Sequence, residues 1–405
     1  MGTTGTSLRG PGLASEEFMK SKSVLMIMAL WGCIASAVAQ REYRVDDVPY
    51  VITSADFNRD GTVDLATIHP ASVCLLFGQG DGRFSQPALC FATEGEMAFP
   101  PAIVAGDFNL DGIPDLATTN SSDHNITIRL GNGDGTFKAI GPYSVARAPR
   151  YVVTADFNLD GLPDVATVSQ SSMSVSVLRG NGDGTLTPAP VRDYGVADNP
   201  VELAVGDFNV DGCPDLISTN FGVNPRYGNT LSLLLGQCDA TFQEARNFTV
   251  GMGPRAAATG DFNGDACPDL AFTNQVDHTV GTLLGDCQGD FPMQLTIAVC
   301  APDYFTPFTI AATELNDDGR TDLVITCRFS TTHQGSDSIL IGAGDGTFQR
   351  GGQYPSGRHP HGVVVADFNG DNRKDLATTH HDYPGIVTVL LGDGQGGFSP
   401  PGGTE

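Results

Sequence analysis

The sequence predicts an all-β protein, a seven-bladed β-propeller built from four-stranded antiparallel blades. A nine-residue acidic motif occurs seven times, and the copies start at Asp56, Asp107, Asp156, Asp207, Asp261, Glu314 and Asp367. The copies follow one another at intervals of 49 to 54 residues, and a regular interval of this length indicates one repeated supersecondary unit. Each interval contains four short apolar or alternating segments and no helical period. Seven such sheets arranged radially would bury the faces that a single sheet leaves exposed.

Each repeat begins at a proline seven residues before the acidic motif, and the third repeat illustrates the pattern. A short apolar strand, 151–155, follows Pro149, and a second strand, 164–168, follows the motif. An alternating strand, 174–178, then leads into a glycine-rich turn, 180–186. A fourth strand continues to the next proline, so the unit is predicted to be a four-stranded meander.

The two ends of the chain indicate how the ring closes. The last repeat ends soon after its turn at Phe398 and lacks a full fourth strand. The segment 41–48 is a spare strand, because Tyr43 stands six residues before Pro49 as a tyrosine does before the proline of three other repeats. We therefore expect residues 41–48 to complete the last blade and to join the first repeat to the last.

Residues 1–39 are predicted to be an N-terminal extension and a secretory signal peptide that starts at Met19 and is cleaved after Ala39. Two lysines precede the apolar run 24–30, and small residues stand at the cleavage point. The run is too short to span a bilayer, and no other stretch is apolar enough to do so. Residues 40–405 then form a single propeller that is secreted to the extracellular space or the periplasm.

The repeated motif has the composition of a calcium-binding loop. Positions 1, 3, 5 and 9 offer carboxylate or amide oxygens, position 7 offers a backbone carbonyl, and Gly at position 6 permits a sharp bend. The Glu at position 12 of an EF-hand is missing, and a metal-free turn rich in Asp, Asn and Gly is the alternative. We expect up to seven Ca²⁺ ions, held by Asp56, Asn58, Asp60, Asp64, Asp107, Asn109, Asp111, Asp115, Asp156, Asn158, Asp160, Asp164, Asp207, Asn209, Asp211, Asp215, Asp261, Asn263, Asp265, Asp269, Glu314, Asn316, Asp318, Asp322, Asp367, Asn369, Asp371 and Asp375.

The formal net charge of −25 follows largely from these loops, since each copy carries three carboxylates. Such a balance argues against a nucleic-acid partner, which requires a basic surface. Without Ca²⁺ the carboxylates of one loop repel one another, so we expect the fold to depend on the ion.

Eight cysteines follow the predicted signal peptide, and an even number in an exported chain favours disulfides. Repeats 4 and 5 alone have a cysteine at motif position 7 and another in the glycine-rich turn. Because these two connections lie at the same end of a meander, we pair them within each repeat. The full prediction joins Cys213 to Cys238, Cys267 to Cys287, Cys74 to Cys90 and, by elimination, Cys300 to Cys327. Lipid attachment at Cys33 is a weaker alternative to signal-peptide cleavage.

The face opposite the acidic loops is the predicted ligand face, because the repeats diverge there. It is built by the residue after each proline and by the end of each second strand. The candidate ligand residues are Tyr50, His69, Arg150, Arg255, Phe308, His361 and His380. A second hypothesis places a Zn²⁺ or Cu²⁺ site in the last repeat, where His359, His361, His380 and His381 gather; solvated loop histidines are the alternative.

The acidic loop and a turn of the form Leu-Leu-Gly-x-Gly-Asp-Gly-Thr-Phe resemble the FG-GAP/VCBS repeat, as in the seven-bladed propeller of integrin α subunits and many secreted bacterial proteins. The resemblance covers the chain from about residue 41 to residue 405. It implies the propeller fold, Ca²⁺ in the loops and a ligand on the opposite face. It does not specify a function, because the fold carries adhesion modules, lectins and a few enzymes.

The function that these observations favour is a secreted, calcium-binding propeller that acts as a non-enzymatic binding or adhesion module. Its partner is a protein or a carbohydrate, and we expect a monomer. No catalytic residue is assigned, because the signatures of hydrolases, phosphate-binding loops and zinc proteases are missing from the sequence. The alternative is a propeller-fold carbohydrate-active enzyme such as a polysaccharide lyase, and a purely structural surface scaffold is a third possibility.

Overall fold

The computed structural model describes residues 1–2, 41–93, 101–223, 226–300, 305–329 and 334–401. One compact unit extends from Gln40 to Gly402. The predicted extension and signal peptide lie outside the described residues apart from Met1 and Gly2. Across the described part of the chain, there is no helix of the length and apolarity that a membrane crossing needs.

The first four blades are four-stranded antiparallel sheets whose strands pair in chain order. Blade 1 contains β2 (Ile52–Ala55), β3 (Asp64–Ile68), β4 (Ser72–Leu76) and β5 (Leu89–Ala92). Blade 2 contains β6 (Ile103–Gly106), β7 (Asp115–Asn120), β8 (Asn125–Gly131) and β9 (Phe137–Ser144). Blade 3 contains β10 (Pro149–Ala155), β11 (Asp164–Ser169), β12 (Ser174–Gly180) and β13 (Leu186–Gly195). Blade 4 contains β14 (Pro200–Gly206), β15 (Asp215–Val223), β16 (Arg226–Leu234) and β17 (Arg246–Thr249).

Blades 5 and 6 repeat this order, and blade 7 differs in its outer edge. Blade 5 contains β18 (Pro254–Gly260), β19 (Asp269–Asn274), β20 (Thr279–Leu284) and β21 (Met293–Ala298). Blade 6 contains β22 (Phe305–Thr313), β23 (Asp322–Phe329), β24 (Gln334–Gly342) and β25 (Phe348–Arg358). Blade 7 contains β26 (Pro360–Ala366), β27 (Asp375–His380), β28 (Ile386–Gly392), β29 (Phe398–Ser399) and β1 (Arg41–Arg44).

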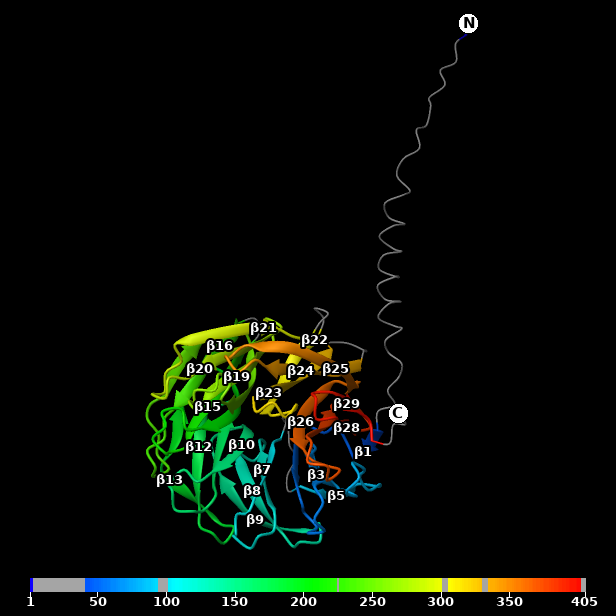
Figure 1. Ribbon diagram of the computed structural model, residues 1–405. Coiled ribbons are helices and arrows are strands. Elements are labelled where there is room, and N and C mark those ends of the chain that lie inside the picture. Colours follow the sequence, from blue (N-terminus) through cyan, green and yellow to red (C-terminus); the bar gives the residue numbers. More distant parts are fainter. Residues whose placement is uncertain (3–40, 94–100, 224–225, 301–304, 330–333, 402–405) are drawn as a thin grey trace. The chain divides into compact units, whose positions relative to one another are not determined.

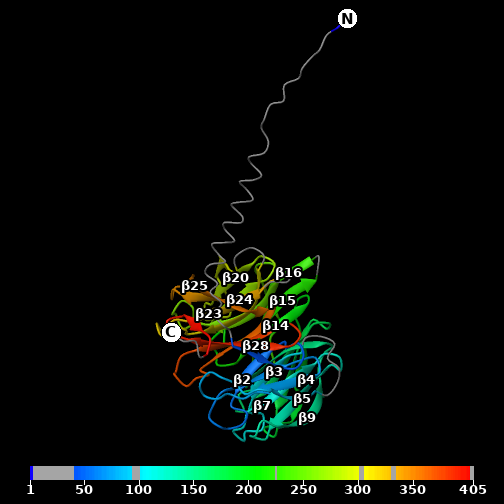
Figure 2. The ribbon, with the colours of Figure 1, turned by 90° about the vertical axis from the view of Figure 1, so that its right-hand side faces the viewer.

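The seven sheets form a closed ring, as the sequence predicts. The first strand of each blade contacts the first strand of the next, and β2 of blade 1 also contacts β26 of blade 7. Figure 1 shows the blue strands of blade 1 beside the red strands of blade 7, and Figure 2 shows the same neighbours after a quarter turn. The prediction of a seven-bladed propeller is therefore confirmed.

The N-terminal strand closes the ring in the predicted way. β1 pairs antiparallel with β28, and Tyr43 stands opposite Val387. The C-terminal strand β29 has only two residues, so β1 supplies most of the outer edge of blade 7. The Tyr43 ring lies 5.5 Å from the Phe84 ring in blade 1, and Tyr194 contacts Phe242 of the next blade in the same way.

Neighbouring blades are joined through position 2 of the acidic motif, which sequence analysis did not single out. Phe occupies this position in six copies and Leu in one, and all seven side chains are buried. The carbonyl of Phe157 accepts a hydrogen bond from the N–H of Ala240, in the turn of the next blade. The Phe157 ring also lies 5.5 Å from the Phe242 ring. Because the motif is repeated, equivalent contacts recur around the ring, including Phe368 with Phe84 where it closes.

The structure contains the four predicted disulfides, with Cys74 bonded to Cys90, Cys213 to Cys238, Cys267 to Cys287 and Cys300 to Cys327. The bridges of blades 4 and 5 tie an acidic loop to the glycine-rich turn of its own blade. The Cys300–Cys327 bridge fastens the end of blade 5 to β23 of blade 6. Four disulfides indicate a protein that resides in an oxidising compartment.

Candidate functional site

Each acidic loop has a fixed backbone shape with two residues in the left-handed region, at motif positions 4 and 6. Position 6 holds Gly in five copies, and Ala266 and Asn372 occupy it with φ of 66° and 64°. Position 4 is left-handed too, and it includes Val210 with φ of 55°. A β-branched residue is strained in this region, so the loop imposes its shape on residues that disfavour it. Sequence analysis predicted the bend at position 6 and missed the one at position 4.

The side chains of positions 1, 3 and 5 fold back onto the loop in every copy. In the third repeat, Asp156 accepts hydrogen bonds from the N–H groups of Asp160 and Gly161, at 3.1 and 2.8 Å. The Asn158 amide donates to Asp160 Oδ2 at 2.8 Å. The equivalent Asn–Asp hydrogen bond is present in all seven loops. The loop therefore presents a ring of carboxylate and amide oxygens at an exposed tip.

Position 9 has a distinct place, because its carboxylate is buried beneath the loop. In the third repeat, Asp164 accepts a hydrogen bond from the N–H of Phe157 at 3.0 Å and from the N–H of Gly180 at 2.8 Å. The side chain is fully buried. All seven copies make the same pair of hydrogen bonds. Position 9 thus fastens the acidic loop to the start of the glycine-rich turn.

The carboxylates of a loop are electrostatically unfavourable in the absence of a cation. Burial raises the pKa of Asp164 to about 6, the two backbone N–H groups oppose this shift, and the charges of Asp160 and Asp156 add to it. A bound cation would offset the cost by stabilising the ionised form. The donor set consists only of oxygens and includes three carboxylates, which is the chemistry that Ca²⁺ prefers. Each Asp164 oxygen retains a second lone pair for a metal.

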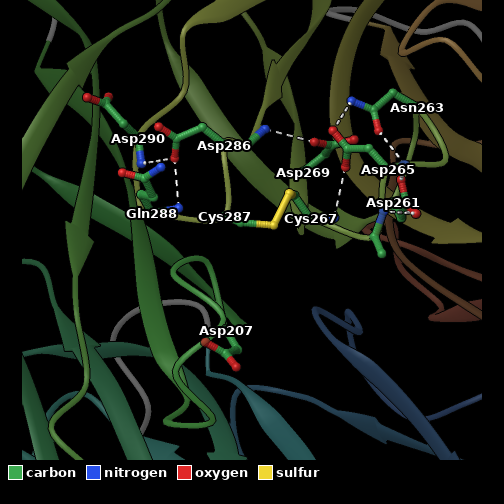
Figure 3. The surroundings of a disulfide bond; sticks show 12 residues. Asp207, Asp261, Asn263, Asp265, Cys267, Asp269, Asp286, Cys287, Gln288 and Asp290 are labelled. Atoms are coloured by element: carbon green, nitrogen blue, oxygen red, sulfur yellow. Dashed lines mark hydrogen bonds between the residues drawn. A yellow bond between two sulfur atoms is a disulfide. The ribbon is translucent and has the colours of Figure 1, made fainter.

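Figure 3 shows this arrangement in blade 5, where Asp261, Asn263 and Asp265 lie in the loop and the Cys267–Cys287 bridge ties it to the adjacent turn. Within the described residues, no three His, Cys, Asp or Glu side chains already converge as a metal site would. In these loops the oxygens face backbone N–H groups and the Asn amide. The assignment of the loop residues as Ca²⁺ ligands therefore stays a prediction.

Replacing Asp164 by alanine should destabilise the protein even without a metal. The substitution leaves the N–H groups of Phe157 and Gly180 buried without an acceptor, and each such loss costs about 1–3 kcal/mol. We expect the free energy of unfolding to fall by about 2–6 kcal/mol in chelator, as measured by urea denaturation. The exposed Asp198→Ala is the matched control and should change stability by less than about 0.5 kcal/mol. An Asp164→Ala variant as stable as the control in chelator would show that Asp164 does not fasten the loop to the turn.

On the opposite face, the residues that follow the prolines come together in the central channel. Strand pairing shifts register directly after the proline in blades 3 to 7, because proline cannot donate a hydrogen bond to the ladder. Such bulges re-aim side chains. A narrow cavity of about 80 Å³ is lined by the residue after the proline of every blade: Tyr50, Pro101, Arg150, Val201, Arg255, Phe308 and His361. Five of the predicted ligand residues are among them.

Aromatic rings and cations pack against one another around this channel. The guanidinium carbon of Arg255 lies 3.5 Å from the centroid of the Phe308 ring, and that of Arg328 lies 5.1 Å from it. The His361 ring lies 4.5 Å from Phe308 and 5.4 Å from Tyr50. Burial, followed by the Arg255 charge, lowers the pKa of His361 well below its usual range, so this imidazole is neutral near pH 7.

A wider cavity of about 620 Å³ opens beside the channel and shares two arginines with it. Arg150 and Arg255 line both cavities, and Phe221, Tyr227 and Gln275 line the wider one. We call this wider cavity the mouth cavity. Its volume is typical of sites for small molecules. Sequence analysis missed Phe221, Tyr227 and Gln275. Phe221 and Tyr227 lie where β15 and β16 extend further than the equivalent strands of blades 2 and 3, and Gln275 directly follows β19.

The structure corrects two of the predicted ligand residues. His69 is fully buried, with Nδ1 2.8 Å from the Asp47 carbonyl oxygen and Nε2 2.9 Å from Thr67 Oγ1. His380 is also buried and contacts Thr388 Oγ1 on the adjacent strand. Both stand at the end of a second strand, where the side chains enter the blade and not the channel. These two side chains therefore do not reach the channel, whereas Phe221 and Gln275, at the ends of two other second strands, line the mouth cavity.

The four histidines of blade 7 do not gather around one point. His359 Nδ1 lies 2.9 Å from Asp382 Oδ1, whereas His380 faces the interior of the blade. Only His361 and His381 stack, with ring centroids 5.6 Å apart. The hypothesis of a Zn²⁺ or Cu²⁺ site in blade 7 is accordingly not carried further.

Comparison with known proteins supports the repeat assignment. The model of the FG-GAP-like repeat matches residues 56–118, 107–167, 156–218 and 315–378, which together exceed half of the chain. No curated protein sequence matches the chain.

Solved structures resemble the chain in fold. A protein from Lactobacillus plantarum is 15% identical with a TM-score of 0.62, and the match covers 87% of this chain and 95% of that one. A protein from Bacteroides uniformis described as a putative 6-phosphogluconolactonase is 16% identical with a TM-score of 0.59, covering 87% and 95%. A lectin from Agrocybe aegerita that recognises non-reducing terminal N-acetylglucosamine is 17% identical with a TM-score of 0.50, covering 76% and 80%. At these identities the likeness concerns the fold alone.

Proposed function

Because the chain belongs to the family of FG-GAP-like repeat proteins, we propose that it is an exported, calcium-binding propeller that acts as a non-enzymatic binding module. The acidic loops on one face hold up to seven Ca²⁺ ions and stabilise the ring. The opposite face, around the channel and the mouth cavity, binds a protein or carbohydrate ligand. We expect the protein to act as a monomer in the extracellular space or the periplasm.

One observation carries this proposal: the two faces differ in how their residues are repeated. The loop face presents the same oxygen donor set in seven copies, and the raised pKa values of its buried carboxylates favour a cation that offsets them. The channel face presents a different side chain from each blade around one opening. Repetition suits a structural ion, whereas divergence on a common scaffold suits recognition.

The channel face favours binding over catalysis. Tyr50, Phe308 and His361 are packed against one another, and the described residues that line the two cavities include no carboxylate pair of the kind that cleaves glycosidic bonds. Surfaces of rings, amides and guanidiniums are typical of binding sites. The lectin among the similar structures makes carbohydrates the first class of ligand to test.

The calcium part of the proposal is tested by counting bound metal. We expect elemental analysis after dialysis against Ca²⁺ to find several ions per chain and at most seven. Asp156→Asn combined with Asp160→Asn should lower the count by one, because two of the three carboxylates of one loop are then neutral. A count of zero in the native chain would show that the loops are only turns.

The ligand part is tested by screening arrays of glycans and extracellular proteins with the native chain and with Tyr227→Ala. Tyr227 lines the mouth cavity, and Tyr383→Ala is a matched control because Tyr383 is 82% exposed and lines neither cavity. We expect Tyr227→Ala to lose the signal and Tyr383→Ala to keep it. Cleavage of a bound glycan would instead support the polysaccharide lyase alternative.

A further inference from the structure

The mouth cavity is locally cationic in a strongly acidic protein. Arg150 and Arg255 line it, and no Asp or Glu appears among the described residues of its wall. The chain as a whole carries 47 Asp and Glu against 22 Lys and Arg. A wall with two guanidiniums and no carboxylate therefore departs sharply from the composition of the chain.

Both guanidiniums are held in place, and most of their N–H groups have no acceptor among the described residues. Arg255 is stacked on Phe308, and among the described residues no side chain or carbonyl accepts a hydrogen bond from its guanidinium. Arg150 donates to Gln170 Oε1 at 3.2 Å, and the Gln170 amide is held in turn by Asn199. A guanidinium has five N–H donors in a planar fork, so most of these donors remain for a ligand.

The positive charge of the two arginines lacks a counter-charge within the cavity. Glu202 is the one carboxylate that lines the adjoining channel among the described residues. Burial raises the pKa of Glu202 to about 8, although Arg255 and Arg150 oppose the shift. Burial and the neighbouring Arg150 charge lower the pKa of Arg255. An anion placed beside the Arg255 guanidinium would oppose this shift by stabilising the charged form of the side chain.

The rest of the wall is suited to a sugar ring. Phe221 and Tyr227 form an edge-to-face pair with centroids 5.6 Å apart, and their rings offer flat apolar surface to the C–H face of a sugar. The Gln275 amide, which can both donate and accept hydrogen bonds, lines the same cavity. A carbohydrate hydroxyl both donates and accepts hydrogen bonds, so it needs a partner that can do both. An acidic peptide would instead be bound by further cationic side chains.

We propose that the mouth cavity binds an acidic sugar, with the carboxylate of a hexuronate residue bridging Arg150 and Arg255 and its ring packed beside Phe221 and Tyr227. This inference rests on the proposed function, since it names the ligand class of the same face. The site favours a short oligosaccharide, because the net charge of −25 repels a long polyanion.

The test is calorimetric titration of the calcium-loaded protein with the trisaccharide of galacturonic acid and with the matching trimer of galactose, which lacks the carboxylates. We expect the acidic trimer to bind at least about tenfold more tightly than the neutral one. Arg255→Gln and Arg150→Gln should each weaken binding of the acidic trimer by about tenfold or more, since a charge-assisted hydrogen bond is worth roughly 1.5–3 kcal/mol and 1.4 kcal/mol is tenfold.

Arg147→Gln is the control, because it removes the same charge from an exposed residue that lies just before β10 and lines neither cavity. It should leave the affinity unchanged. Thermal unfolding of each variant checks that the fold is intact, and Arg255→Lys, which retains the charge but not the planar fork, should restore part of the affinity. Equal binding of both trimers, or an affinity unaffected by Arg255→Gln, would overturn the inference and leave the binding module in place.

Preferential binding of polyglutamate would replace the sugar by an acidic peptide and would also overturn the inference. Binding of neither trimer, while the arrays show another ligand that depends on Tyr227, would overturn only the acidic-sugar class. If the native chain gave no signal on any array, the proposed binding function itself would be contradicted.

Discussion

Removal of Ca²⁺ should lower the thermal midpoint of unfolding sharply. Each site that is filled at a hundred times its dissociation constant adds about 2.7 kcal/mol to the free energy of unfolding, so four such sites would add about 11 kcal/mol. The physical reason is that each loop carries three carboxylates within nine residues, where burial raises the pKa of Asp164 and the charges of Asp160 and Asp156 add to the shift. The measurement is scanning calorimetry of the chain with Ca²⁺ and with a chelator.

In this experiment, the screening of charge repulsion by any salt must be separated from specific binding of Ca²⁺ by the loops. A chain of net charge −25 gains stability from any salt, because the repulsion between its carboxylates is screened. Potassium chloride at the same ionic strength as the calcium salt is therefore the control, and it should recover only a small part of the midpoint. Equal midpoints in the two salts would contradict Ca²⁺ binding by the loops.

Deletion of residues 40–48 should open the ring. The deletion removes β1 from the outer edge of blade 7, together with the buried side chains of Tyr43 and Val45. Loss of a buried aromatic side chain costs about 3–5 kcal/mol, and loss of a buried valine about 1.5–3 kcal/mol. We expect the free energy of unfolding to fall by about 5–8 kcal/mol, measured by urea denaturation in Ca²⁺.

Point variants show whether the loss comes from ring closure. Tyr43→Ala removes the ring that contacts Phe84 of blade 1 and should reproduce more than half of the effect. Glu42→Ala changes an exposed residue of the same strand and should leave the protein within about 0.5 kcal/mol of the native chain. A truncated chain that unfolds like the full chain would show that β29 suffices to complete blade 7.

The two faces of the ring divide stability from recognition. On one face, the position 2 carbonyl joins an acidic loop to the turn of the next blade, as Phe157 does to Ala240, and the buried carboxylate of position 9 fastens the loop to the turn of its own blade. On the other face, bulges after the prolines direct one side chain per blade into the channel.

The amino-acid sequence by itself determined the number of blades, the acidic loops, the strand that closes the ring and the disulfide pairs. Each of these features depends on a repeated pattern or on the positions of residues within one repeat, except the Cys300–Cys327 pair, which followed by elimination. The motif at Asp156 and the turn at Gly180 recur at a constant spacing, so their positions in the unit follow from the chain alone. Cys267 and Cys287 fall at corresponding connections of one meander, which is why their pairing was predictable.

Only the tertiary structure decided which residues line the channel and what position 9 does. Arg255 of blade 5 stacks on Phe308 of blade 6, and no local pattern records a contact between two blades. His69 and His380 were predicted on the ligand face, yet the pleat of the second strand turns them into the blade. The bulge after the proline in blades 3 to 7 is likewise a property of strand pairing. Side-chain direction depends on register and on neighbouring blades, and the structure supplies both.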